Sequence, residues 1–262
     1  MNKTILFQSC HINYIISGKG PALMLIHGFT ENHHIWDDFR GKLEHEFTVI
    51  TPALPAHGGS EFPAEGLNME WMSDCLVEIM KTENIDEALM VGHSMGGYVM
   101  MNLAKKYPQH CKSLCLFHSS AQADTSEIKA NRERTIEVIR SNHSGFLHTF
   151  IIDLFAQSHR ERLQSEINEL ISAACEISAE GLIACMNAMK NRESSLDFLC
   201  TTQKPVGFII GKLDSRVPFD SVLAQSALPQ QSHVLILGDC GHMGYLEKPQ
   251  QTLKFIRYFA NN

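Results

Sequence analysis

The chain contains 262 residues, and 44% of them are hydrophobic, which suffices to fill the core of one large α/β domain or of two small ones. The formal net charge is −7, and the basic residues form no cluster beyond the short segment 131–134. This charge balance argues against nucleic-acid binding. No apolar run approaches the ~18 residues needed to cross a bilayer, so we expect no membrane span.

The N-terminal segment 1–20 alternates polar and apolar side chains and has no long apolar stretch followed by a small-residue cleavage site. We expect a hairpin of two strands there and a soluble, cytoplasmic protein. The eight cysteines are scattered without a Cys-x-x-Cys pair, which favours buried thiols over disulfides or metal ligands. His33 and His34 lack a third ligand at useful spacing, so we expect no metal site.

Short apolar segments alternate along the chain with amphipathic helical segments. The apolar segments are typical of buried strands and cover residues 22–28, 47–54, 87–94, 113–120, 205–211 and 233–240. Helical spacing is found at 36–46, 69–82, 95–107 and 249–260. This alternation predicts a parallel sheet with helices on both faces.

The interval from Gln122 to Leu199 contains helical periodicity and no convincing strand. Asp124, followed three residues later by Glu127, resembles a capping box that starts a helix over 126–140. Further helices are expected over 145–156, 161–176 and 179–192. We therefore predict an all-helical insertion between two halves of one sheet.

The segment "MVGHSMGGYVMM", residues 90–101, places Ser94 where a predicted strand ends and a helix begins. Ser94 has Gly92 two residues before it and Gly96 two residues after it, the G-x-S-x-G pattern of a nucleophile elbow. In such a turn the serine has a strained backbone, and side chains at the glycine positions would collide with neighbouring backbone. The pattern predicts that Ser94 is a nucleophile.

A serine nucleophile needs a base, an orienting acid and an oxyanion hole. His242 follows the last predicted strand and is the candidate base, and Asp214 follows the preceding strand and is the candidate acid. The backbone N–H groups of Phe29 and Met95 are the candidate oxyanion donors. All of these residues follow the carboxyl ends of predicted parallel strands, where open α/β sheets form their sites.

Two other carboxylates, Asp239 and Asp197, are alternatives for the acid. Asp239 is only three residues from His242, which makes the approach to the ring awkward, and Asp197 requires its segment to fold back over the site. His93 is expected to pack within the elbow. Five apolar residues of the insertion could line an acyl pocket, but their helical spacing favours ordinary core packing: Phe146, Phe150, Phe155, Met186 and Met189.

Five motifs in chain order resemble those of the α/β-hydrolase superfamily. They are "HGF" at 27–29, "PAHGGS" at 55–60, "GHSMGG" at 92–97, "GKLDSRVP" at 211–218 and "GHMGYLEKP" at 241–249. The resemblance extends over almost the whole chain. It departs at Ala53 and Ala56, where many relatives have Asp and Gly, and this affects the sheet edge rather than the triad.

The resemblance implies an α/β-hydrolase fold with a core over residues 1–121 and 201–262 and a helical cap over 122–200. It also implies a serine hydrolase that cleaves a small carboxylic ester or related acyl substrate through Ser94, His242 and Asp214, without a cofactor or metal. C–C bond hydrolysis, acyl transfer, a lyase reaction of the menaquinone-pathway type and a ligand receptor with residual activity remain alternatives on this fold. The sequence indicates neither the natural substrate nor the oligomeric state.

Overall fold

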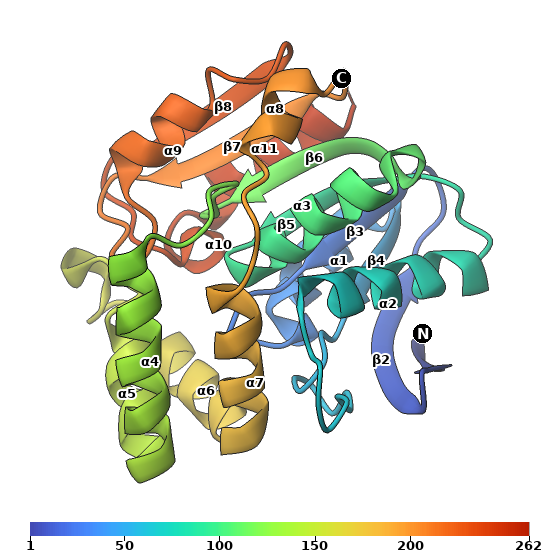
Figure 1. Cartoon of the computed structure of the whole chain (residues 1–262). Helices are drawn as coiled ribbons and strands as arrows, with labels where there is room; N and C mark the ends of the chain where they lie inside the picture. The colour runs from blue at the N-terminus through green and yellow to red at the C-terminus, as the bar shows by residue number, and fades with distance from the viewer. Residues whose placement is uncertain (262) are drawn as a thin grey trace.

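The computed structural model describes residues 1–261, and within them eight strands form one sheet in the order β1-β2-β4-β3-β5-β6-β7-β8 (Figure 1). Neighbouring strands from β4 to β8 are parallel, whereas β2 is antiparallel to both β1 and β4. The predicted N-terminal hairpin and mostly parallel sheet are therefore confirmed. The strands are β1 (Asn2–Phe7), β2 (Cys10–Ser17), β3 (Ala22–Ile26), β4 (Thr48–Pro52), β5 (Ala88–His93), β6 (Cys111–Phe117), β7 (Val206–Gly211) and β8 (Ser232–Leu237).

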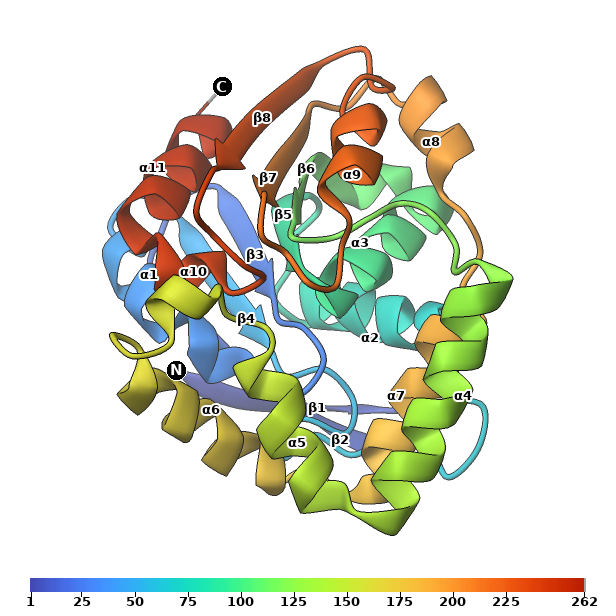
Figure 2. The same cartoon turned by 90° about the vertical axis from the view of Figure 1, so that its left-hand side faces the viewer.

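Helices cover both faces of this sheet. Figure 2 shows α1 (Asp37–Leu43) and α11 (Pro249–Ala260) on one face, and α2 (Met69–Thr82), α3 (Met95–Lys106) and α9 (Phe219–Gln225) on the other. Every residue of β5 and of β7 is buried, as expected for central strands covered on both faces. The remaining short elements of the core are α10 (Gly244–Glu247) and the 3₁₀ helices η1 (His33–Trp36) and η2 (Pro108–His110).

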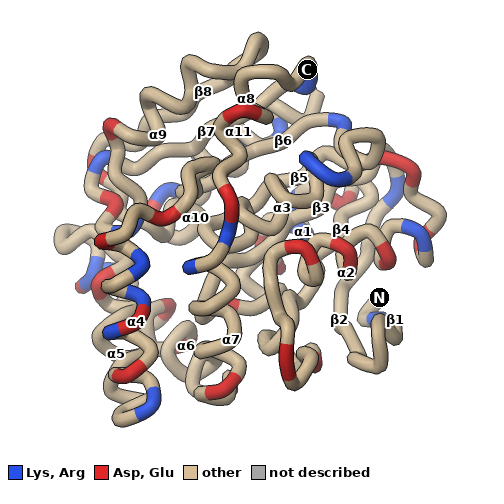
Figure 3. Tube along the Cα trace, viewed as in Figure 1, with Lys and Arg blue, Asp and Glu red and all other residues tan. Residues whose placement is uncertain are grey.

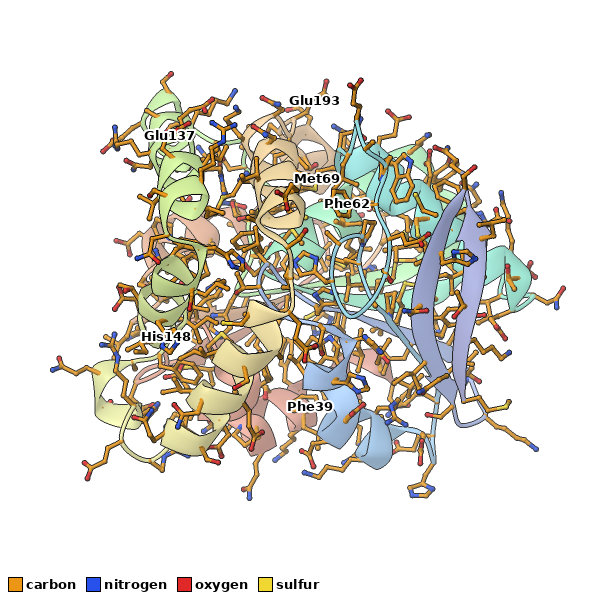
Figure 4. The ribbon with its side chains drawn as sticks, turned by 90° about the horizontal axis from the view of Figure 1, so that it is seen from below. Phe39, Phe62, Met69, Glu137, His148 and Glu193 are labelled. Carbon is orange, nitrogen blue, oxygen red and sulfur yellow. The ribbon has the colours of Figure 1, made fainter. Side chains whose placement is uncertain are left out.

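The predicted helical insertion follows β6. It contains α4 (Ser126–Ser141), α5 (His143–Ile152), η3 (Gln157–His159), α6 (Gln164–Cys175) and α7 (Ala179–Lys190). Figure 4 shows the labelled Glu137 of α4 and His148 of α5 on the outer side of these helices. The short helix α8 (Leu196–Thr201) lies apart from them in Figures 1 and 2. We propose that α4 to α7 form the cap.

The start of α4 differs from the prediction. The capping residue is Thr125, whose hydroxyl accepts a hydrogen bond from Ile128 N at 3.3 Å, so the capping box predicted at Asp124 is wrong. The Asp124 carboxylate binds two guanidinium groups instead, at 2.5 Å from Arg132 Nε and 2.6 Å from Arg192 Nη1. Charged donors hold this carboxylate more strongly than a backbone N–H group would.

No helix within residues 1–261 is long and apolar enough to span a membrane. All eight cysteines are free thiols, and only Cys175 and Cys200 are exposed. Burial raises the pKa of Cys111 and of Cys185 to about 12, which keeps these thiols protonated and unreactive at neutral pH.

Helix α3 approaches β5 so closely that only glycine fits at Gly92. A Cβ atom on Gly92 would lie 2.5 Å from Gly97 Cα and 2.6 Å from Gly96 O, both of which are backbone atoms of α3. A Cβ atom on Gly41, by contrast, would meet no atom within 4 Å.

We predict that Gly92→Ala lowers the free energy of unfolding by about 1–3 kcal/mol or more, because α3 must move away from the sheet. The matched variant Gly41→Ala lies at an exposed position of helix α1 and should be neutral or stabilising by up to about 1 kcal/mol. Urea unfolding followed by circular dichroism measures both. Equal stability of G92A and wild type would contradict the close contact.

Candidate active site

Ser94 occupies a sharp turn between β5 and α3. Its φ of 49° lies in the left-handed region, which is rarely adopted by residues other than glycine, and its ψ is −118°. Hydrogen bonds to the end of β6 fix the turn, with 3.0 Å from Ser94 N to Phe117 O and 2.7 Å from Ser119 Oγ to Ser94 O. The Ser94 side chain is thereby held at the carboxyl end of the sheet.

His242 and Asp214 lie together beyond β8 and β7. His242 Nδ1 is 2.9 Å from each carboxylate oxygen of Asp214, and His242 N donates to Leu154 O at 2.7 Å. Asp214 Oδ1 also accepts from Arg216 N at 2.8 Å and Val217 N at 3.0 Å. Since Asp214 occupies Nδ1, Nε2 is the ring nitrogen left for other partners.

Ser94, His242 and Phe29 line one cavity of about 250 Å³. Met95 is the first residue of α3, so its N–H group has no intrahelical acceptor. No hydrogen bond joins Ser94 to His242 within residues 1–261. In structures without substrate, such catalytic hydrogen bonds are often long and tighten only in the substrate complex.

The alternative acids lie elsewhere. The Asp239 side chain is 65% exposed and bonds to Lys248 Nζ at 2.6 Å. Asp197 is exposed on α8. The geometry therefore favours Asp214 as the partner of His242.

Sequence reasoning missed a second histidine on the same carboxylate. His118 Nδ1 lies 3.1 Å from Asp214 Oδ2, and its side chain is completely buried. Its Nε2 lies 4.0 Å from Cys240 Sγ, and a thiol hydrogen donated to Nε2 places the ring proton on Nδ1. His118 comes directly after β6, next to β7 in the sheet, and this position was the signal that could have identified it.

These two histidines control the ionisation of Asp214. Burial alone would raise the pKa of this carboxyl, but the charge of His242 and the hydrogen bonds from both rings hold it well below its usual range. Burial lowers the pKa of His118, so this ring is a neutral donor. The possible ligand atoms of these three residues lie within 4.8 Å of one another, and their hydrogen bonds explain that spacing without a metal ion.

A second buried acid, Glu31, was also missed. Its Oε2 accepts from Gly28 N at 2.5 Å and lies 3.0 Å from His93 Nδ1, while Tyr245 Oη donates to its Oε1 at 3.1 Å. His93 Nε2 donates to the backbone oxygen of His242 at 2.9 Å. Burial disfavours a charged ring, yet Glu31 raises the pKa of His93, and both ring nitrogens face acceptors. His93 therefore does more than pack within the elbow, because it connects Glu31 to the backbone of His242.

The apolar residues of the insertion pack in the core, and some of them also border the cavity. Met186 and Met189 are buried in the core and Phe150 packs against it, as expected, but all three also line the cavity that contains Ser94. Phe146 packs on Phe150 with ring centroids 5.1 Å apart, and Phe155 is buried. Helical periodicity identified the buried face of each helix but not the cavity that this face borders.

Comparison with known proteins gives a match over residues 21–249 to the family model described as "alpha/beta hydrolase fold". A pimeloyl-[acyl-carrier protein] methyl ester esterase of Aromatoleum aromaticum is 28% identical over 249 residues, which cover 90% of this chain and 96% of that protein. Uncharacterized proteins of Mycobacterium bovis and Mycobacterium tuberculosis are 34% identical over 116 residues, which cover 43% of this chain. The matched part spans only 34% of the length of those mycobacterial proteins.

Among solved structures, a thermophilic esterase of Thermogutta terrifontis, with malate bound, superposes with a TM-score of 0.93 at 27% identity. The superposition covers 100% of this chain and 98% of that one. This chain and that esterase thus share one fold over their whole length, including the sheet and the helices between β6 and β7.

We predict that removing the His118 donor shifts the acid limb of the kcat/KM profile for ester hydrolysis to higher pH. With one donor fewer on Asp214, the remaining side-chain donor, the His242 ring, interacts more strongly with the carboxylate, so a higher pH is needed for full activity. One neutral hydrogen bond corresponds to a shift of roughly 0.5–1 pH unit.

The matched pair for this measurement is His118→Ala and His118→Asn. Both truncate the ring, but the Asn amide keeps a donor near Nδ1 and tolerates the φ of 47° at this position. The shift is expected in H118A and should be largely absent in H118N. Coincident profiles for the two variants would show that His118 has only a packing role.

Proposed function

Because the chain belongs to the α/β-hydrolase fold family, we propose that it is a serine hydrolase that cleaves a small carboxylic ester or a related acyl compound. The observation that carries the proposal is the placement of Ser94 on a strained elbow in the same cavity as His242, whose Nδ1 is held by Asp214. Two relatives with esterase names support the ester as the substrate class.

In the proposed reaction, Ser94 Oγ attacks the ester carbonyl while His242 Nε2 accepts the hydroxyl proton. Asp214 stabilises the resulting imidazolium and keeps Nε2 directed toward the cavity. The N–H groups of Phe29 and Met95 donate to the oxyanion. His242 then protonates the leaving alcohol, and a water molecule that it deprotonates hydrolyses the acyl-enzyme.

The cavity size favours small substrates. Its volume of about 250 Å³ lies below the ~300–1,000 Å³ of typical drug-sized ligand sites. Phe150 from α5 and Met186 and Met189 from α7 border it, so we propose that the cap sets the range of acyl chains.

We predict turnover of p-nitrophenyl esters, with kcat/KM highest for short acyl chains and falling for long ones. Ser94→Ala should lower kcat by at least about 10⁴-fold, because the nucleophile is lost while the fold is kept. The control is Ser120→Ala, since the Ser120 hydroxyl bonds to Gln225 outside this cavity. Absence of turnover by the wild type on the whole ester series, or full activity of S94A, would refute the proposed function.

A further inference from the structure

Two arginines, Arg132 and Arg216, line the cavity beside Ser94 in a protein whose formal net charge is −7. Acidic and basic residues are interspersed over the fold, as Figure 3 shows, so the overall charge does not explain a local excess of one sign. Apart from histidines, the charged residues that line this cavity within residues 1–261 are Glu31, Arg132 and Arg216.

Glu31 adds no net negative charge to the cavity. Its carboxylate is 3.0 Å from His93 Nδ1, and the two side chains are 2% and 1% exposed. Although burial opposes both charges, each partner favours the charged form of the other: the pKa of Glu31 is lowered and that of His93 is raised. The pair is therefore neutral as a unit.

Arg132 belongs to a group with one positive charge in excess. The buried Asp124 carboxylate binds both Arg132 and Arg192, so one negative charge faces two positive ones. Arg132 Nη1 meets the sulfur atoms of Met186 at 3.7 Å and of Met189 at 3.5 Å. Thioether sulfur is a weak acceptor, so this cavity-facing nitrogen can still bind an anion.

Arg216 has no carboxylate within 4.0 Å in the part of the chain that the structure describes. Its guanidinium lies 4.5 Å from the Phe150 ring centroid, and its Nη2 is 3.5 Å from Phe150 O. Two carboxylates act on this guanidinium from beyond 4.0 Å, and each already has closer partners: Asp153 binds Arg160 at 3.4 Å, and Asp214 binds His118 and His242. Asp214 Oδ1 accepts a hydrogen bond from Arg216 N at 2.8 Å, which places this exposed arginine beside the proposed triad.

We propose that the ester cleaved at Ser94 carries a carboxylate or a similar anionic group, which Arg216 and Arg132 bind. The inference rests on the proposed function and names the substrate class of that site. A planar guanidinium binds a carboxylate through two parallel hydrogen bonds. The apolar wall of Phe150, Met186 and Met189 accommodates the methylene groups between the ester and the anion.

The test compares two esters of equal acyl length, p-nitrophenyl butyrate and mono-p-nitrophenyl succinate. The ratio of their kcat/KM values, anionic ester over neutral ester, should decrease by about tenfold to a hundredfold from wild type to Arg216→Met. A decrease of this size is expected for loss of an ionic hydrogen bond. Arg216→Lys keeps the charge and should restore part of the ratio. The control Arg140→Met, on α4 like Arg132 but outside this cavity, should leave the ratio unchanged.

A second pair, phenyl acetate and 4-acetoxybenzoate, places the carboxylate on the alcohol side instead. A ratio that depends on Arg216 in either pair supports the inference and assigns the anion to that side. If both neutral esters are hydrolysed and neither ratio changes in R216M or in Arg132→Met, the inference fails while the proposed function stands.

If the wild type hydrolyses none of the esters, the proposed function fails, and calorimetric binding of glutarate to wild type and R216M decides the inference. Binding that R216M loses supports an anion site, and absence of binding to the wild type overturns it.

Discussion

The buried carboxylate of Asp214 connects the parts of the chain that form the site. It accepts hydrogen bonds from His118 after β6, from its own loop after β7 at Arg216 and Val217, and from His242 after β8. An ionised carboxylate that is removed from water is costly unless donors surround it. The same donors that offset this cost fix the direction of the His242 ring, so the stability of the charge and the geometry of the site depend on one set of contacts.

A second buried charge pair holds His242 from its backbone side. Glu31 follows β3 and binds His93 at the end of β5, and His93 donates to the backbone oxygen of His242. Ring and backbone of His242 are thus held by different carboxylates that come from different strands. Because both its ring and its backbone are held, His242 stays close to one geometry. A reaction requires such a fixed geometry, since the reacting atoms must approach within a short distance of each other.

The sequence was sufficient for the sheet, the inserted helices and the proximity of Asp214 to His242, because buried strands and glycine-rich turns have strong local patterns. It was not sufficient for His118 and Glu31, whose partners are distant in sequence and meet only across the sheet. Asp124 was misassigned because a local capping pattern competed with two guanidinium groups, those of Arg132 on the same helix α4 and of Arg192 beyond α7. Ala56 has a φ of 71°, in the left-handed region that strains residues other than glycine, and the sequence pattern did not indicate this conformation.

The central claim is that Ser94 is the covalent nucleophile. The most direct measurement is to react the protein with a fluorophosphonate probe and to locate the adduct by peptide mass spectrometry. The account predicts one adduct, on the peptide that contains Ser94, and its loss when His242 is replaced by alanine. An adduct on Ser119 or Ser120, with Ser94 unmodified, would contradict it.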